Sequence, residues 1–168
     1  MSTIDEMLAA NAEFAKTFVG RALPAQPARR VAIVACMDAR IDPFRALGIA
    51  EGDAHIIRNA GGRVVEALRS LAISQQLLGT AEVAIIHHTH CGMATFTDAD
   101  IRQKLRENLG ADADHIAFLP FSAREIEDSV RADLAIYRQS PIVRHDIPVR
   151  GFVYEVLTGR LCEVNPTP

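Results

Sequence analysis

The sequence predicts an α/β fold, in which a central and mainly parallel β-sheet is flanked by helices. Two short apolar runs, at residues 31–35 and 83–86, have the length and the β-branched content of buried strands. Between them, residues 63–78 carry apolar side chains at helical spacing. Strands that alternate with helices pair in parallel through right-handed crossovers. The 168 residues suit one domain, residues 1–168, and show no internal repeat.

The first element is a predicted helix over residues 3–19, with Thr3 as its cap and Gly20 as its stop. The apolar side of this helix consists of Ile4, Met7, Leu8, Phe14, Ala15 and Phe18. The proline-containing stretch 22–29 separates the helix from the first strand, so residues 1–20 form an N-terminal helical arm. We expect another protein surface to pack against this apolar side. From the residues alone, this surface is equally well that of a neighbouring subunit or that of the arm's own domain.

The middle of the chain supplies the first two crossovers. The strand at residues 31–35 is followed by a short strand at residues 54–57, after the turn at Gly52 and Asp53. The long helix over residues 63–78 comes next and stops at Gly79, since glycine readily takes the left-handed conformation that ends a helix. The strand at 83–86 then completes a three-stranded unit.

The last third of the chain predicts two helices and a hairpin. The helices cover residues 98–108 and 123–138, and Ser122 with Glu125 has the spacing of a capping box for the second. The hairpin joins residues 150–157 to 160–164, and its first strand could extend the sheet. Cys162 lies within this hairpin, where we expect a buried small hydrophobic residue.

Composition excludes several classes of function. The net charge is −3, with no cluster of basic residues, which gives nucleic acid no electrostatic reason to bind. The longest apolar run, residues 31–37, is far too short to cross a membrane. Asp5 and Glu6 stand where a secretory signal would be basic. The three cysteines do not form a disulfide framework, so we expect a reduced, cytoplasmic protein.

Metal-binding residues follow two of the predicted strands. Cys36 comes directly after the strand at 31–35, and His88 and Cys91 follow the strand at 83–86. The carboxyl ends of parallel strands gather at one edge of the sheet, so these side chains should converge there. Two cysteines and one histidine suit Zn²⁺, and three protein ligands with a free fourth position are typical of catalytic zinc.

Histidines near these ligands have alternative interpretations. His88 is the expected ligand because its spacing to Cys91 lets one tight turn aim both side chains at one metal ion. His90 is the rival, although a position in the middle of the turn favours solvent exposure or a local hydrogen bond. His55 and His87 lie beside strand ends, where structural histidines with satisfied hydrogen bonds are more common than proton carriers.

Asp38 and Arg40 stand beside the first ligand. In extended backbone the side chains of Cys36, Asp38 and Arg40 point the same way. A carboxylate beside a zinc thiolate either takes the fourth coordination position or is held away from it by a bidentate arginine. With Arg40 holding Asp38, zinc would keep a water molecule whose pKa falls to about 7. A surface ion pair is the alternative interpretation, which the neighbouring ligands make much weaker.

Gly61 and Gly62 lie in the segment that opens the long helix. Glycines at a helix start allow close approach of the backbone and present N–H groups. Such groups suit an anionic product or a developing oxyanion. Gly-Gly is common in ordinary turns, and only its place next to the inferred zinc makes it a candidate substrate-binding segment.

Three motifs together resemble the β-class carbonic anhydrases, most closely their short bacterial members. They are C-x-D-x-R from Cys36, G-D-A-H-I-I-R-N-A-G-G at residues 52–62, and H-H-T-x-C-G-M at residues 87–93. The resemblance implies a mainly parallel sheet and a dimer as the minimal unit. It also implies zinc on Cys36, His88 and Cys91, with Asp38 and Arg40 as a gating dyad. His90 departs from the pattern, because close relatives usually have Asp there.

The expected function is reversible hydration of carbon dioxide to bicarbonate by a zinc-bound hydroxide, which makes the protein a zinc lyase (carbonate dehydratase). Some members of the resembled family hydrolyse carbonyl sulfide or carbon disulfide with the same metal centre, so that activity is the alternative. A zinc-binding module without turnover is a third and weaker hypothesis. The expected partners are a small-molecule substrate and further copies of the chain, in a homodimer or homotetramer, without nucleic acid or membrane.

Overall fold

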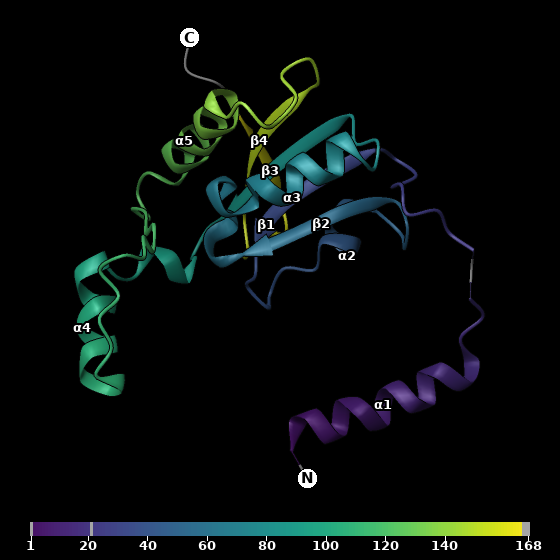
Figure 1. Cartoon of the computed structure of the whole chain (residues 1–168), viewed down its shortest axis with the longest axis horizontal. Helices are drawn as coiled ribbons and strands as arrows, with labels where there is room; N and C mark the ends of the chain where they lie inside the picture. The colour runs from purple at the N-terminus through teal and green to yellow at the C-terminus, as the bar shows by residue number, and fades with distance from the viewer. Residues whose placement is uncertain (1, 21, 166–168) are drawn as a thin grey trace.

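The computed structural model describes residues 2–20 and 22–165, and it contains the predicted α/β fold (Figure 1). Five strands form one sheet in the order β2-β1-β3-β4-β5. Their bounds are β1 Val31–Cys36, β2 Ala54–Asn59, β3 Glu82–His88, β4 Val149–Tyr154 and β5 Leu161–Val164. β2, β1, β3 and β4 pair in parallel, whereas β5 runs antiparallel to β4. The prediction of a central, mainly parallel sheet is confirmed.

The helices cover most of the predicted ranges. Their bounds are α1 Thr3–Thr17, α2 Pro43–Leu47, α3 Val64–Gln76, α4 Asp98–Leu109 and α5 Ile126–Gln139, with 3₁₀ turns η1 Ala60–Gly62 and η2 Gly92–Ala94. The sequence interpretation did not include α2, which is short but well delimited. Asp42 caps its first turn by accepting from the backbone N–H groups of Phe44 and Arg45, and Gly48 ends it in the left-handed conformation.

The main core lies between the sheet and two helices. α3 and α5 lie side by side on one face of the sheet (Figure 1). Residues from both helices and from β1, β3 and β4 form this core, among them Val34, Leu71, Ile85, Val130 and Leu134. On the opposite face, Ile33, Ala35 and Ile86 pack with partly buried residues that include Leu47 of α2. β1 and β3 are therefore covered on both sides, which explains their continuous apolar sequences.

Three predicted helix ends are wrong. α1 stops at Thr17, with Phe18 in extended backbone as its C-cap, and so ends before Gly20. α1 is capped by Ser2 and not by Thr3, because Ser2 and Asp5 exchange two hydrogen bonds as a capping box. α5 begins at Ile126, three residues later than predicted, and Glu125 stands at its N-cap without a side-chain bond. Ser122 instead accepts from the N–H of Arg124 within a turn of its own. The capping-box spacing was present, but the backbone between the two residues is not helical.

The final hairpin extends the sheet, as predicted. β4 pairs with β3 in parallel, and β5 pairs with β4 at the outer edge. The prediction that Cys162 is buried is wrong, because this cysteine is exposed. β5 has a neighbour on one side only, and Val164 is its one buried residue.

The N-terminal arm is exposed along the part that the structure describes, residues 2–20. α1 lies apart from the sheet (Figure 1), and none of its residues is buried. Its large apolar side chains are exposed, with Met7 at 64% and Leu8 at 65%. Packing of this arm on a partner subunit stays a prediction. Among the residues that the structure describes, no helix has both the length and the apolar character that crossing a bilayer requires.

Candidate metal centre

The three predicted metal ligands meet at one edge of the sheet. Cys36 is the last residue of β1 and His88 is the last residue of β3, its parallel neighbour. Cys91 lies in the turn that follows β3. One donor atom from each residue lies within 4.8 Å of the other two, and all three side chains are buried. The edge is formed by the carboxyl ends of the strands, which is where sites gather in this class of fold.

His88 presents a nitrogen that has no partner. Its Nδ1 lies 3.0 Å from the carbonyl oxygen of Thr89, and because a carbonyl only accepts, Nδ1 carries the hydrogen. The lone pair is then on Nε2, the ring atom without a hydrogen-bond partner among the described residues, although it is buried. Leaving a buried polar atom unpaired is costly. A ligand for Nε2 is therefore required, and a metal ion supplies one.

The two sulfur atoms are at the separation that zinc requires. Thiolates bind zinc at about 2.3 Å in tetrahedral geometry, so two of them lie about 3.8 Å apart. The Sγ atoms of Cys36 and Cys91 are 3.8 Å apart. Together with the free Nε2 of His88, this S₂N donor set fits zinc, with one tetrahedral position left over.

Hydrogen bonds already favour a thiolate at this place. A bond from Cys91, assisted by the backbone N–H groups of Asp38 and Gly61, lowers the pKa of Cys36 to about 4 despite burial. The N–H of Gly61 lies 3.3 Å from Cys36 Sγ. The same contact raises the pKa of Cys91, because Cys91 keeps its proton to donate it to the Cys36 sulfur; burial and repulsion between two neighbouring thiolates raise this pKa further. A cation between the two sulfurs removes that repulsion.

Asp38 and Arg40 form a bidentate pair at the edge of the site. Arg40 Nε lies 2.9 Å from Asp38 Oδ1, and its terminal nitrogen lies 2.6 Å from Oδ2. The same terminal nitrogen donates to the carbonyl oxygen of His90 at 2.8 Å. These bonds from Arg40 hold the pKa of Asp38 well below its usual range. Asp38 Oδ2 lies 3.8 Å from Nε2 of His88, so an ionised carboxylate faces the metal position.

Arg58 is a further residue of this edge that sequence reasoning missed. Its side chain donates to two backbone carbonyl groups, that of Cys36 at 2.9 Å and that of Asp38 at 2.6 Å. It thereby fixes the loop that carries both the ligand and the acid. The only available signal was its place near the end of a strand, three residues before Gly61.

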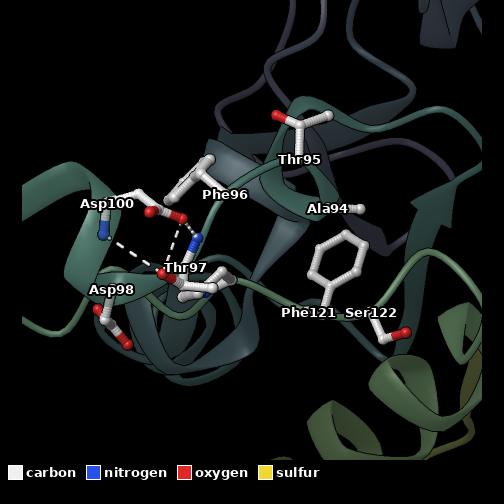
Figure 2. Close-up of a pocket in the computed structure, with 9 residues that line it drawn as sticks. Ala94, Thr95, Phe96, Thr97, Asp98, Asp100, Phe121 and Ser122 are labelled. Carbon is white, nitrogen blue, oxygen red and sulfur yellow. Dashed lines mark hydrogen bonds between the residues drawn. The ribbon is translucent and has the colours of Figure 1, made fainter.

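A cavity of about 410 Å³ opens directly on the donor cluster. Its lining includes Cys36, Asp38, Gly61, Cys91, Met93 and Phe96. A second cavity, of about 620 Å³, adjoins it and shares Thr95 and Phe96 (Figure 2). The carboxylates of this second cavity are already used, since Asp100 caps α4 through Thr97 and Asp98 accepts from the N–H of Phe118. We therefore place the chemistry in the smaller cavity.

The two glycines of the candidate substrate segment face different surroundings. Gly61 lines the cavity, and its N–H is directed at the sulfur of Cys36. Gly62 is buried behind it, where an added Cβ would come within 2.9 Å of the backbone N of Cys36 and of the carbonyl oxygen of Ile86. Direct contact of the two glycines with substrate stays a prediction.

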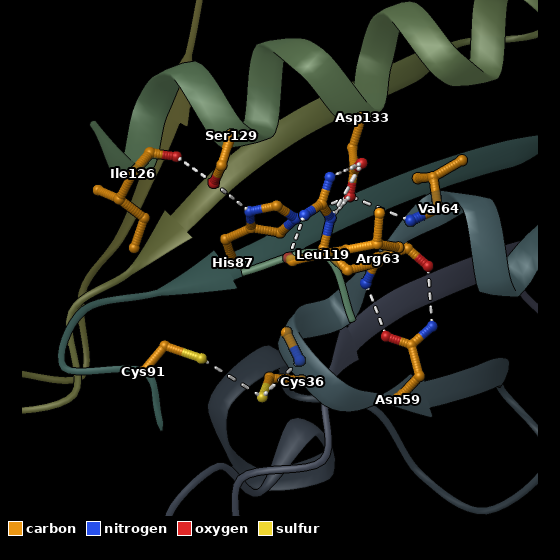
Figure 3. A network of polar contacts seen from close by, with 11 residues as sticks. Cys36, Asn59, Arg63, Val64, His87, Cys91, Leu119, Ile126, Ser129 and Asp133 are labelled. Carbon is orange, nitrogen blue, oxygen red and sulfur yellow. Dashed lines mark hydrogen bonds and ion pairs between the residues drawn. The ribbon is translucent and has the colours of Figure 1, made fainter. Parts of the chain in front are cut away.

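The other histidines lie outside the donor cluster. His55 has partners on both ring nitrogens, Ser74 and the carbonyl of Ala25. His87 is fully buried and bonded to Ser129 and Asp133 (Figure 3). The side chain of His90 is exposed, and its backbone has a φ of 55°.

Comparison with known proteins identifies the family. A family model described as carbonic anhydrase matches residues 31–161. The β-carbonic anhydrase 1 of Mycobacterium tuberculosis is 46% identical over 167 residues, which cover 99% of this chain and 100% of that protein. The chain belongs to the β-carbonic anhydrase family.

One solved structure and one further relative by sequence agree with this placement. A crystal structure of carbonic anhydrase from Streptococcus mutans is 48% identical, has a TM-score of 0.92, and covers 98% of this chain and 99% of its own. A carbon disulfide hydrolase from Acidianus sp. is 30% identical over 159 residues, which cover 82% of this chain and 78% of that protein. β-Carbonic anhydrases use zinc, and the Cys-His-Cys cluster fits such a site. The protein is a zinc lyase of the carbonate dehydratase type.

Proposed function

We propose that the protein catalyses the reversible hydration of carbon dioxide to bicarbonate at zinc held by Cys36, His88 and Cys91. The convergence of two thiol sulfurs with the unpartnered Nε2 of His88, at the floor of a cavity, carries this proposal. When bound, zinc supplies Lewis acidity that makes water a nucleophile near neutral pH, because it lowers the pKa of a water ligand to about 7. The three side chains position the metal and leave one position open.

Asp38 and Arg40 are the proposed catalytic dyad. Arg40 occupies both carboxylate oxygens of Asp38 and anchors itself on the carbonyl of His90. This keeps Asp38 from the fourth coordination position while its Oδ2 still faces the site. Oδ2 accepts a hydrogen bond from the attacking water and thereby aims the water's lone pair at the substrate carbon. The depressed pKa of Asp38 keeps this oxygen an acceptor.

The cavity suits a small, linear and apolar substrate. Ala60, Gly61, Met93 and Phe96 provide walls without charge beside the donor atoms. We propose that Gly61 and Gly62 form the substrate-binding segment. Gly61 lines the cavity and carries no side chain that would fill it, and Gly62 lets the backbone behind it approach Cys36 closely. Cys36, Cys91 and Asp38 bring polar atoms to the cavity where bicarbonate would form, and the hydroxyl of Thr95 is already bonded to the carbonyl of Gly92.

Hydrolysis of carbon disulfide or carbonyl sulfide is the alternative, supported by the 30% identical carbon disulfide hydrolase. The carbonic anhydrase relative favours carbon dioxide, since it is 46% identical and matches over its whole length. The Asp38–Arg40 pair argues against a zinc module without turnover, because such a module would need Asp38 as a permanent fourth ligand.

Parallel assays test the proposed substrate. Stopped-flow measurement of carbon dioxide hydration should give the higher kcat/KM, and sulfide release from carbonyl sulfide or carbon disulfide should be the slower reaction. The zinc-free protein, prepared with a chelator, provides the background for both assays. Faster release of sulfide than hydration of carbon dioxide would reverse the assignment, and the absence of both activities in zinc-loaded protein would support the module hypothesis.

We further propose one catalytic domain over residues 1–168, with residues 1–20 as an arm that packs on a second copy in a homodimer. The apolar side of α1 supports this arrangement, since it is exposed over four turns and none of the described residues of its own chain buries it. Two such dimers could also pair, and the assembly would then be a homotetramer. A cytoplasmic location is consistent with three free cysteines.

Charge placed on the apolar side of α1 should dissociate the dimer. The double variant Met7→Glu and Phe14→Glu should sediment as a monomer at micromolar concentration, because burying two unpaired carboxylates is costly. Ala9→Glu, on the opposite side of the same helix, is the matched control and should remain dimeric. A parent protein that is a fully active monomer at this concentration would contradict the proposal.

A further inference from the structure

A buried polar network lies directly behind the metal centre (Figure 3). It joins Arg63, at the start of α3, to Asp133 of α5 and to His87 of β3. Asp133 and His87 are fully buried, and Arg63 is 7% exposed. None of these side chains lines the catalytic cavity, so the proposed reaction leaves the network without a function.

Asp133 is the centre of the network. Arg63 Nε and its terminal nitrogen each approach Asp133 Oδ1 or Oδ2 at 3.0 Å, and the backbone N–H of Val64 donates to Oδ2 at the same distance. A third nitrogen of Arg63 donates to the carbonyl of Leu119 at 2.7 Å. Burial raises the pKa of Asp133, but the bonds from His87 and Arg63 outweigh it, and the net shift is downward. Asp133 is therefore a carboxylate that fixes the first turn of α3.

One branch of the network reaches the end of β3. His87 precedes the ligand His88, and its Nε2 lies 3.1 Å from Asp133 Oδ2 while its Nδ1 lies 2.6 Å from Ser129 Oγ. The ring of Phe121 stacks on His87, with centroids 5.5 Å apart. Both ring nitrogens of His87 are therefore tied to α5, which fixes the strand end that carries His88.

The other branch reaches the thiolate through the turn at residues 59–63. The Asn59 amide closes this turn, since its Nδ2 donates to the carbonyl of Arg63 and its Oδ1 accepts the N–H of Arg63. Inside the turn, Gly61 directs its N–H at Cys36 Sγ. An added Cβ on Gly61 would meet Phe121 at 3.2 Å, so the ring that stacks on His87 also lies against this turn.

We infer that Arg63, Asp133 and His87 are positioning residues, which fix where the Gly61 N–H and the His88 ring lie relative to each other. By fixing these two groups they set the affinity of the site for zinc and the donor strength of the Cys36 sulfur. The two branches start from one carboxylate and end at two different ligands. The inference rests on the zinc site proposed above and extends it to residues that touch neither metal nor substrate.

The chemistry of the network favours positioning over simple stabilisation. A buried ion pair is weak evidence for stability, because desolvation of the two charges offsets most of their attraction. The ion pair does provide a fixed geometry. Arg63 and Asp133 form a bidentate pair, and each makes one further bond, to the carbonyl of Leu119 and from the N–H of Val64, so the side chains can take only one arrangement. Hydrogen bonds behind metal ligands commonly change metal affinity or activity 10- to 100-fold when they are removed.

The test measures zinc affinity and the cobalt spectrum of Asp133→Asn. This substitution keeps the size of the side chain but removes the charge that pairs with Arg63. Competition with a chelator should show an increase of about tenfold or more in the zinc dissociation constant. In the Co²⁺-loaded variant, the thiolate-to-cobalt charge-transfer band should shift, because the Cys36 sulfur loses a properly directed N–H donor.

Tyr137→Phe is the matched control. Tyr137 also joins α5 to α3, since its hydroxyl bonds Gln75 at 2.8 Å and the carbonyl of Arg144 at 2.7 Å, but it has no link to the turn at residues 59–63. This variant should unfold at a lower temperature and keep the parental zinc affinity and cobalt spectrum. Equal weakening of zinc binding in Tyr137→Phe and Asp133→Asn would overturn the inference, since the cause would then be general loss of stability.

A milder variant decides the matter if Asp133→Asn does not fold. Arg63→Lys keeps the positive charge but cannot hold Asp133 and Leu119 in a fork, so it should shift the cobalt band in the same direction. Parental affinity and an unshifted band in the folded variant would overturn the inference while leaving the proposed function intact. A parent protein that binds no zinc would instead overturn the proposed function, and the inference with it.

Discussion

Cys36→Ser, His88→Ala and Cys91→Ser should each give a folded protein that has lost most of its zinc and nearly all of its carbon dioxide hydration. A complete zinc site contributes roughly 10–16 kcal/mol of binding, so one ligand of the set accounts for about 3 kcal/mol, on the order of a 100-fold loss of affinity. The catalytic loss should be larger still, because the remaining metal has the wrong geometry. Metal analysis after dialysis against a weak chelator measures the first effect, and stopped-flow hydration measures the second.

His90→Ala is the control for the ligand assignment. His90 lies two residues from His88 and one from Cys91, but its side chain is exposed and contributes only its backbone carbonyl to Arg40. The variant should therefore retain its zinc and most of its activity. If His90→Ala lost its metal while His88→Ala kept it, the assignment of the third ligand would be wrong.

The fold could be predicted because its determinants are local. Apolar runs of strand length alternate with a helix of clear periodicity, and a mainly parallel sheet follows from that order. The short helix α2 was missed because five residues carry no periodicity, although Asp42, Pro43 and Gly48 mark both of its ends. The position of Cys162 was misjudged because burial on an edge strand depends on which neighbours the sheet provides, and these come from elsewhere in the chain.

The metal donors could be predicted, and the network behind them could not. Cys36, His88 and Cys91 each stand next to a strand end, so the topology alone brings them together. Arg63 and Asp133 are 70 residues apart, and nothing near either of them in the sequence indicates the other. Long-range pairs of this kind depend on how α5 packs against α3, which sequence periodicity does not specify.

The second prediction with a large effect concerns Arg40. In Arg40→Ala the carboxylate of Asp38 loses both of its charge-assisted bonds, and the guanidinium that anchors the pair on the carbonyl of His90 is gone. Asp38 keeps only the bond that its Oδ1 accepts from the backbone N–H of residue 40. A carboxylate without a charged partner in a partly dry site is costly, and zinc beside it would be a cation that it can bind directly. Asp38 Oδ2 is already 3.8 Å from His88 Nε2, so a small rotation brings it to the fourth position.

Arg40→Ala should therefore keep its fold and its zinc but lose activity by roughly 100-fold or more, beyond the usual effect of removing an outer-shell partner. The loss arises because a zinc site closed by four protein ligands has no position for water. Asp38→Asn should also be poor, for a different reason: its amide cannot accept both bonds from Arg40 and cannot orient water in the same way. A crystal structure of zinc-loaded Arg40→Ala should show an oxygen of Asp38 as the fourth protein ligand of the metal, beside the two sulfurs and the nitrogen. An active Arg40→Ala enzyme with water still in that position would show that Arg40 does not hold the site open.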